Sequence, residues 1–155
     1  MCAQRIRELY IIESELKTNE FVENVCVVGD SSQTYLVALI VPSLVKLESL
    51  AITNNNYISN NNSHKLLTNE KVISSVLNSI KQQMLKSGFS KTEIPQKIKL
   101  CVEEWTPDNG LLTAAMKIRR KQIQDFYAND IKNLYIRDDN HNKGNSAKKR
   151  TCISL

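Results

Sequence analysis

The residues of this sequence best suited to chemistry are four closely spaced cations, Lys117, Arg119, Arg120 and Lys121. They follow a loop of turn-forming residues that contains the only tryptophan, Trp105. We expect the cations at the start of a helix, where each positive charge opposes the helix macrodipole by about 0.3–1 kcal/mol. Local stability therefore does not explain their placement. Two interpretations stay open: a solvated basic face, or an anion site in which Lys117 faces a phosphate or a carboxylate.

Other kinds of site find little support in the sequence. His64 and His141 have no partner at metal-ligand spacing, and we interpret both as solvated side chains. No glycine-rich phosphate loop and no nucleophile elbow occurs. Cys26 and Cys101 lie within apolar runs, which predicts buried thiols rather than a zinc site or a disulfide framework. From these residues alone the chain is not expected to be a self-sufficient enzyme.

The length and composition of the chain limit the classes of protein to which it can belong. The 155 residues suit one domain that buries about 68–70% of its unfolded surface. With 41% hydrophobic and 24% charged residues, wholesale disorder and fibrous repeats are excluded. The longest apolar run, Tyr35–Pro42, is far short of the ~20 residues of a membrane-spanning helix. The net charge of +5 is modest and aromatic residues do not alternate with the basic ones, so nucleic-acid binding is disfavoured.

The pattern of apolar residues predicts the elements that must position the cations. A short helix is expected within 13–19, followed by a β-hairpin of two strands, 21–30 and 34–41. An asparagine-rich loop at 54–64 precedes an amphipathic helix that begins after Thr68 or Asn69 and ends at Gly88. The remaining expected elements are a helix at 44–53, a strand at 97–102, a loop at 103–113 and a final helix at 114–135. This order predicts an α+β fold: a small antiparallel sheet of about three strands with packed helices.

The loop and the cations resemble the C-terminal domain of long-chain fatty-acid–CoA ligases, which belong to the AMP-forming adenylating superfamily. The resemblance covers residues 13–135, leaving 1–12 as a non-matching segment and 136–155 as an expected disordered basic tail. The similar motifs are Glu93-Ile94-Pro95, Glu104-Trp105-Thr106-Pro107, Gly110-Leu111-Leu112-Thr113 and Lys117-Ile118-Arg119-Arg120-Lys121.

This resemblance implies a two-step reaction with ATP and CoA as co-substrates and Mg²⁺ in the full-length enzymes. A long-chain fatty acid and ATP give acyl-AMP and pyrophosphate, and CoA then displaces AMP. The family places a lysine of this domain over the adenylation site, and Lys117 occupies that position. The domain then rotates and presents another face for thioester formation. A glycine often precedes the lysine in the wider superfamily, whereas this chain has Ala115-Met116.

The large ATP- and fatty-acid-binding domain of the family has no counterpart in these 155 residues. We therefore expect an incomplete enzyme that is inactive alone and whose partner is a large adenylating domain. The resemblance implies a place on the cytoplasmic side of the endoplasmic reticulum or the mitochondrial outer membrane. A non-catalytic interaction or regulatory domain remains the alternative.

The last residues suggest a modification. Cys152 is the fourth residue from the end and follows the basic run Lys148-Lys149-Arg150, which is the layout of a prenylation box. A lipid and a basic cluster together would hold the chain at a membrane surface. Ser154 stands where such boxes prefer an aliphatic residue, and an unmodified polar tail stays open as the second interpretation.

Overall fold

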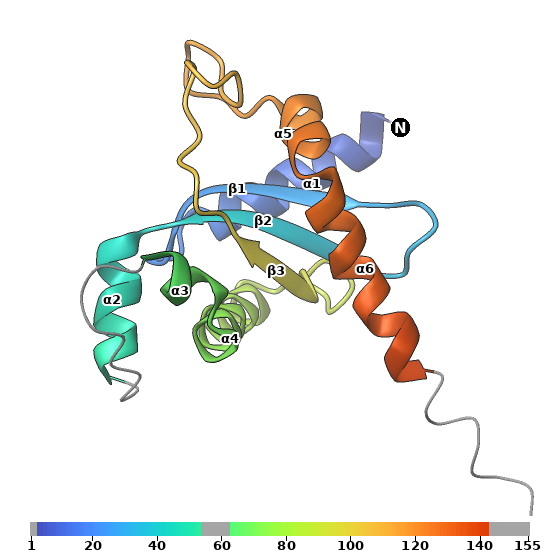
Figure 1. Ribbon diagram of the computed structural model, residues 1–155. Coiled ribbons are helices and arrows are strands. Elements are labelled where there is room, and N and C mark those ends of the chain that lie inside the picture. The colour runs from blue at the N-terminus through green and yellow to red at the C-terminus, as the bar shows by residue number, and fades with distance from the viewer. Residues whose placement is uncertain (1–2, 54–62, 143–155) are drawn as a thin grey trace, which may run out of the picture.

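The computed structural model describes residues 3–53 and 63–142, and side chains within 8–52 and 64–136. These residues form an α+β fold in which six helices surround a three-stranded sheet (Figure 1). The strands are β1 (Val22–Gly29), β2 (Leu36–Pro42) and β3 (Lys97–Leu100). The helices are α1 (Ala3–Leu16), α2 (Leu44–Thr53), α3 (Ser63–Thr68), α4 (Glu70–Lys86), α5 (Arg120–Phe126) and α6 (Ala128–Asn142).

The predicted β-hairpin is confirmed. Strands β1 and β2 pair antiparallel, with Val27 opposite Ala38. The connecting turn is stabilised by Asp30, whose carboxylate accepts hydrogen bonds from the backbone N–H and the hydroxyl of Ser32, both at 2.8 Å. This local bond is the usual reason that Asp and Ser favour turns. The strands on either side are rich in β-branched residues, which suit a pleated, buried surface.

The orientation of the third strand corrects the sequence prediction. The strand order is β1-β2-β3, and β3 runs parallel to β2, with Ile98 opposite Ala38. The sheet is therefore mixed and not antiparallel throughout. The physical reason is the long connection between β2 and β3, which contains α2, α3 and α4. A helical crossover of this kind brings the chain back to the end where β2 began, so that the next strand runs in the same direction.

Both faces of the sheet are buried, as expected for the continuous apolar run of β2. Alternate residues of β1 and β2 enter two cores. The first core joins the sheet to α1, α2, α3 and α4 through residues such as Val25, Ile40, Val76 and Ile80. The second core joins the opposite face to α5, α6 and the loop that follows β3; it contains Cys26, Val28, Val37, Leu39, Val41, Cys101, Trp105, Leu111, Leu112, Ile123, Tyr127 and Tyr135. Figure 1 shows α4 and α6 on different sides of the sheet.

Helix α4 has the ends that its sequence predicts. The side chain of Asn69 accepts a hydrogen bond from the backbone N–H of Lys71 at 2.9 Å, which is an N-cap. Gly88 follows the helix with a φ of 85°. The backbone N–H of Phe89 reaches the carbonyl of Met84 at 3.0 Å, which is the bond of a Schellman motif.

Three predicted helical boundaries are wrong. The first helix begins at Ala3 and not near Glu13, because Leu9, Ile12 and Leu16 bury one helical face in the first core. Helix α3 occupies the end of the expected asparagine-rich loop, whose residues 54–62 lie outside the described part of the chain. The single helix expected at 114–135 is a turn followed by α5 and α6, which are separated at Tyr127.

Candidate functional site

The loop after β3 is held to the protein by Trp105. Its side chain is 1% exposed and lies in the second core. The indole N–H donates a hydrogen bond to the hydroxyl of Tyr127 at 3.4 Å. Burying a side chain of this size provides the main apolar anchor for a loop with little regular structure. The loop that leads to the cations is therefore fixed at its beginning.

Asn109 fixes the turn that follows. Its side-chain oxygen accepts from the backbone N–H groups of Thr106 at 3.0 Å and Leu111 at 3.2 Å. Its side-chain nitrogen donates to the carbonyl of Glu104 at 2.9 Å. Gly110 adopts a φ of 75°, the left-handed region that glycine enters without steric cost. The Asp108-Asn109-Gly110 sequence thus forms a turn whose backbone groups are bound by one amide side chain.

A second, smaller turn carries Lys117. Leu112 and Ile118 form an antiparallel bridge, and the backbone N–H of Thr113 donates to the carbonyl of Lys117 at 2.8 Å. The N–H of Lys117 donates in return to the hydroxyl of Thr113 at 3.1 Å. We call residues 112–118 the lysine hairpin. Met116, at its tip, has a φ of 59°, which is uncommon for a residue with a side chain.

Lys117 is exposed and lies three residues before α5 begins at Arg120. Lys117 is exposed, as predicted, but it lies before the helix and not in its first turn, because α5 starts six residues later than the expected helix. Lys117 is held at the base of the lysine hairpin by its own N–H and C=O groups. Its backbone is therefore fixed while its side chain projects from the surface, which leaves the ammonium group available to an anion.

The four cations do not form one cluster. Arg119 is exposed and its guanidinium donates to the carbonyl of Gly110 at 3.3 Å. Lys121 is exposed on the first turn of α5. Arg120 points inward instead, and forms an ion pair with the buried carboxylate of Glu13 at 2.7 Å. The two interpretations, a basic face and an anion site, therefore apply only to Lys117, Arg119 and Lys121. Arg120 instead forms a structural ion pair with Glu13.

Glu13 is the important residue that sequence reasoning missed. Its side chain is 5% exposed, and its carboxylate accepts a hydrogen bond from the backbone N–H of Val27 at 2.8 Å. Burial raises its pKa above the ordinary value, against the opposing effects of the Val27 N–H and the Arg120 guanidinium. The one sequence signal for the burial of Glu13 is its place directly after Ile12, on the apolar side of α1.

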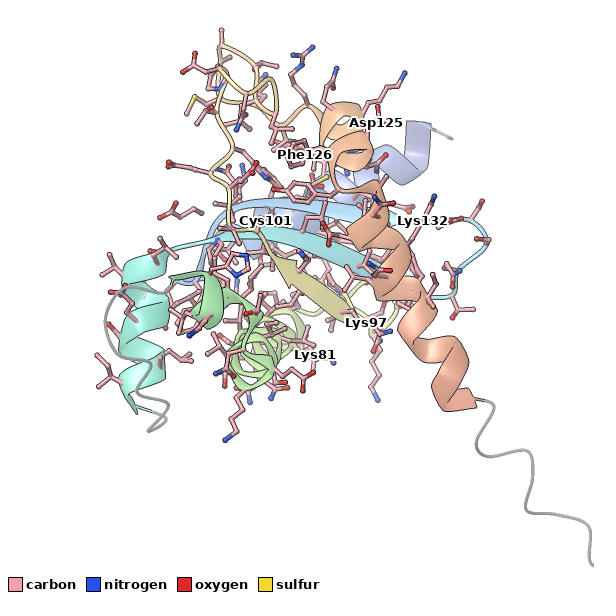
Figure 2. All side chains as sticks on the ribbon, viewed as in Figure 1. Lys81, Lys97, Cys101, Asp125, Phe126 and Lys132 are labelled. Atoms are coloured by element: carbon pink, nitrogen blue, oxygen red, sulfur yellow. The ribbon has the colours of Figure 1, made fainter. Side chains whose placement is uncertain are left out.

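The two cysteines predicted to be buried are buried. Cys26 lies in β1 and Cys101 follows β3 (Figure 2), and both belong to the second core. Burial raises the pKa of each thiol to about 12. At neutral pH both are therefore uncharged thiols and poor nucleophiles. They act as core side chains beneath the Trp105 loop.

Several predicted features are placed on the surface or beyond the described structure. His64 is exposed on α3, and the side chain of His141 is not among those described. Cys152 lies outside the described residues, so its prenylation stays a prediction. Among residues 3–53 and 63–142 no helix has the length and apolarity needed to cross a membrane. The described side chains include no group of three or more His, Cys, Asp or Glu arranged to hold a metal ion.

Solved structures share the fold of this chain. The adenylation domain of the carboxylic acid reductase from Segniliparus rugosus, in complex with AMP, superposes with a TM-score of 0.69 at 23% identity. The match covers 83% of this chain and 18% of that one. The adenylation domain of the carboxylate reductase from Mycobacterium chelonae superposes with a TM-score of 0.66 over 82% of this chain. The fold is that of a part of these two adenylation domains.

Curated relatives identify the family, although no protein-family model matches the chain. Long chain acyl-CoA synthetase 8 of Arabidopsis thaliana is 34% identical over 124 residues, which are 80% of this chain and 17% of the relative. Fatty acyl-CoA synthetase B of Dictyostelium discoideum is 32% identical over 128 residues, 83% of this chain and 19% of the relative. The chain belongs to the long-chain acyl-CoA synthetase family, and it spans less than one fifth of the length of these two relatives.

Proposed function

We propose that this chain is the C-terminal, lysine-bearing domain of a long-chain fatty-acid–CoA ligase, and that Lys117 acts in the adenylation step. The observation that carries the proposal is the placement of Lys117, exposed at the base of a hydrogen-bonded hairpin in a chain of this family. The overall reaction would convert a long-chain fatty acid, ATP and CoA into acyl-CoA, AMP and pyrophosphate. Mg²⁺ would accompany ATP on the large domain.

The chemical task of Lys117 follows from where charge develops during adenylation. The carboxylate of the fatty acid attacks the α-phosphate of ATP, and pyrophosphate leaves. A fixed ammonium group beside these oxygens stabilises the transition state more than the separated reactants, and this difference lowers the barrier. The side chain is long and flexible, whereas the backbone of Lys117 is bound on both sides. That combination suits a charge that must be delivered to a site on another domain.

The chain alone is expected to be inactive, because the segment that it matches makes up only 17% and 19% of these two relatives and the rest of their sequence has no counterpart here. The partner is therefore a large adenylating domain that binds ATP and the fatty acid. Assayed alone with ATP, palmitate and CoA, the chain should release no pyrophosphate above background.

The test places the domain in a complete enzyme. Residues 3–142, which include all six described helices, would replace the matching segment of Long chain acyl-CoA synthetase 8, and Lys117→Ala would be compared with the unsubstituted chimera. Loss of one preorganised contact to developing charge typically costs about 10²–10³-fold in rate, so pyrophosphate release should fall by that factor. Thioester formation from supplied acyl-AMP should change little. Lys132→Ala, which removes an exposed lysine of α6 (Figure 2), is the control and should leave both rates unchanged. Equal loss in both half-reactions for Lys117→Ala would contradict the proposal.

A further inference from the structure

Arg120 and Glu13 together provide hydrogen-bond partners for backbone groups at one open edge of the sheet. Strand β1 is an edge strand, because the order is β1-β2-β3. At Val27 the backbone N–H donates to the Glu13 carboxylate at 2.8 Å, and the carbonyl accepts from the Arg120 guanidinium at 2.7 Å. One residue of β1 therefore receives both of the bonds that a neighbouring strand would have provided.

The ion pair itself has close geometry. One guanidinium nitrogen of Arg120 donates to both oxygens of Glu13, at 2.7 and 2.8 Å, while the other donates to the Val27 carbonyl. That second nitrogen also lies 3.7 Å from the sulfur of Cys26. The side chain is 20% exposed and that of Glu13 is 5% exposed. A guanidinium held by three short bonds, away from most of the solvent, has little freedom to move.

Arg120 is also the point at which the lysine hairpin joins the body of the protein. The hairpin ends at Ile118, and the backbone N–H of Arg119 is bound to the carbonyl of Leu111 at 2.9 Å. The next residue, Arg120, begins α5. Because Lys117 is only three residues away, the position of its backbone depends directly on where Arg120 is anchored. On the other side of the hairpin, the Trp105 loop provides the second anchor.

We propose that Arg120 is a positioning residue for Lys117: its bonds to Glu13 and Val27 hold the base of the lysine hairpin against the sheet edge, so that the ammonium group is delivered in one orientation. This proposal rests on the proposed function of Lys117. Arg120 does not touch a substrate in this arrangement, since its donors are directed toward Glu13 and Val27. Misplacement of a reacting group by about 1 Å can cost about 10²-fold in rate, which gives such an anchor a kinetic effect.

The first test uses the chain as it is and needs no activity. Hydrogen exchange would be measured at the Thr113 and Arg119 amides, which bond across the lysine hairpin, and at the Ile80 amide in the middle of α4. Arg120→Gln should speed exchange at the two hairpin amides by about 10-fold or more and leave Ile80 unchanged. Arg120→Lys, which cannot reach Glu13 and Val27 together, should give an intermediate effect. Lys132→Gln is the control that removes an equal charge. Unchanged hairpin exchange, or an equal increase at Ile80, would overturn the proposal.

The second test measures coupling in the chimeric ligase. Arg120→Gln should slow pyrophosphate release by roughly 10–10²-fold, with little effect on thioester formation from supplied acyl-AMP. If Arg120 acts through Lys117, the double variant Arg120→Gln/Lys117→Ala should be no slower than Lys117→Ala alone. Multiplied losses would show an independent role and overturn the proposal. A Lys117→Ala enzyme with normal adenylation would instead refute the proposed function, and hydrogen exchange would still decide whether Arg120 anchors the hairpin.

Discussion

Trp105 and Tyr127 join the lysine-bearing loop to the junction of two helices. Their ring centroids are 6.4 Å apart and tilted by 48°, and the indole N–H donates to the phenol oxygen at 3.4 Å. Tyr127 is the residue between α5 and α6 and is 6% exposed. Burial raises the pKa of its hydroxyl well above the ordinary value, so that the group stays protonated and can serve both Trp105 and Cys101.

Tyr127→Phe should therefore destabilise the chain by about 1–3 kcal/mol. The change leaves the buried indole N–H of Trp105 without its acceptor, and an unsatisfied buried donor costs its full desolvation. Urea unfolding followed by the fluorescence of the single tryptophan measures the effect. Tyr10→Phe, at a side chain that is 67% exposed, is the matched control and should stay within about 0.5 kcal/mol. Equal stability of the two variants would refute the role of the hydroxyl.

Met116→Gly should stabilise the lysine hairpin. Met116 has a φ of 59° and is 61% exposed, so the substitution relieves backbone crowding and removes little packing. Left-handed geometry destabilises an L-residue by roughly 1–2 kcal/mol, and glycine avoids this cost. Glycine also gives the unfolded chain more conformational freedom, which lowers the stability of the variant by about 0.5–1 kcal/mol. We expect a net gain of about 0.5–1 kcal/mol in the free energy of unfolding, measured in urea. Ala115→Gly, at a neighbouring position with an ordinary φ, should lower stability instead. A loss at both positions would contradict the prediction.

The buried thiols should make stability depend on alkaline pH. The pKa of Cys26 and of Cys101 is about 12 in the folded chain, against 9.0 for an ordinary thiol. Between these values the unfolded thiols ionise while the folded ones remain protonated. Stability is therefore fully retained below pH 9 and falls as the pH rises, by up to about 1.4 kcal/mol per pH unit for each thiol.

Unfolding in urea at several values between pH 8 and 10.5 tests this slope. The double variant Cys26→Ala/Cys101→Ala is the comparison, because it differs from the parent only at the two thiols. The variant should be less stable at pH 8, since it leaves cavities, but its stability should fall less steeply with pH. Parallel slopes for the two proteins would show that the thiols are not the cause.

The sequence predicts those parts of the fold that depend on neighbouring residues. The β1–β2 hairpin follows from two β-branched runs around a polar turn, and α4 follows from its apolar stripe between Asn69 and Gly88. The exposure of Lys117 follows from the charged residues around it. Each of these features is determined by interactions within a few residues, so that a local pattern contains the information.

The features that sequence reasoning missed depend on contacts between distant residues. The parallel direction of β3 is fixed by how three helices pack between it and β2. The predicted helix at 114–135 is shortened because Leu112 pairs with Ile118, and a helix cannot form where this bridge does. The partner of Arg120 lies 107 positions earlier in the chain, at Glu13. No spacing rule connects two such residues.

That separation has a consequence for the order of folding. The β1–β2 hairpin closes a short loop and can form early, whereas the Glu13–Arg120 contact must close a loop of more than a hundred residues. During synthesis from the N-terminus, Glu13 and the free edge of β1 emerge long before Arg120 does. Until α5 is made, Glu13 can bind the N–H of Val27, but the carbonyl of Val27 has no donor from Arg120 and Glu13 has no cation beside it. The completion of α5 is thus the step that neutralises the buried carboxylate and completes the hydrogen bonds of Val27 at the sheet edge.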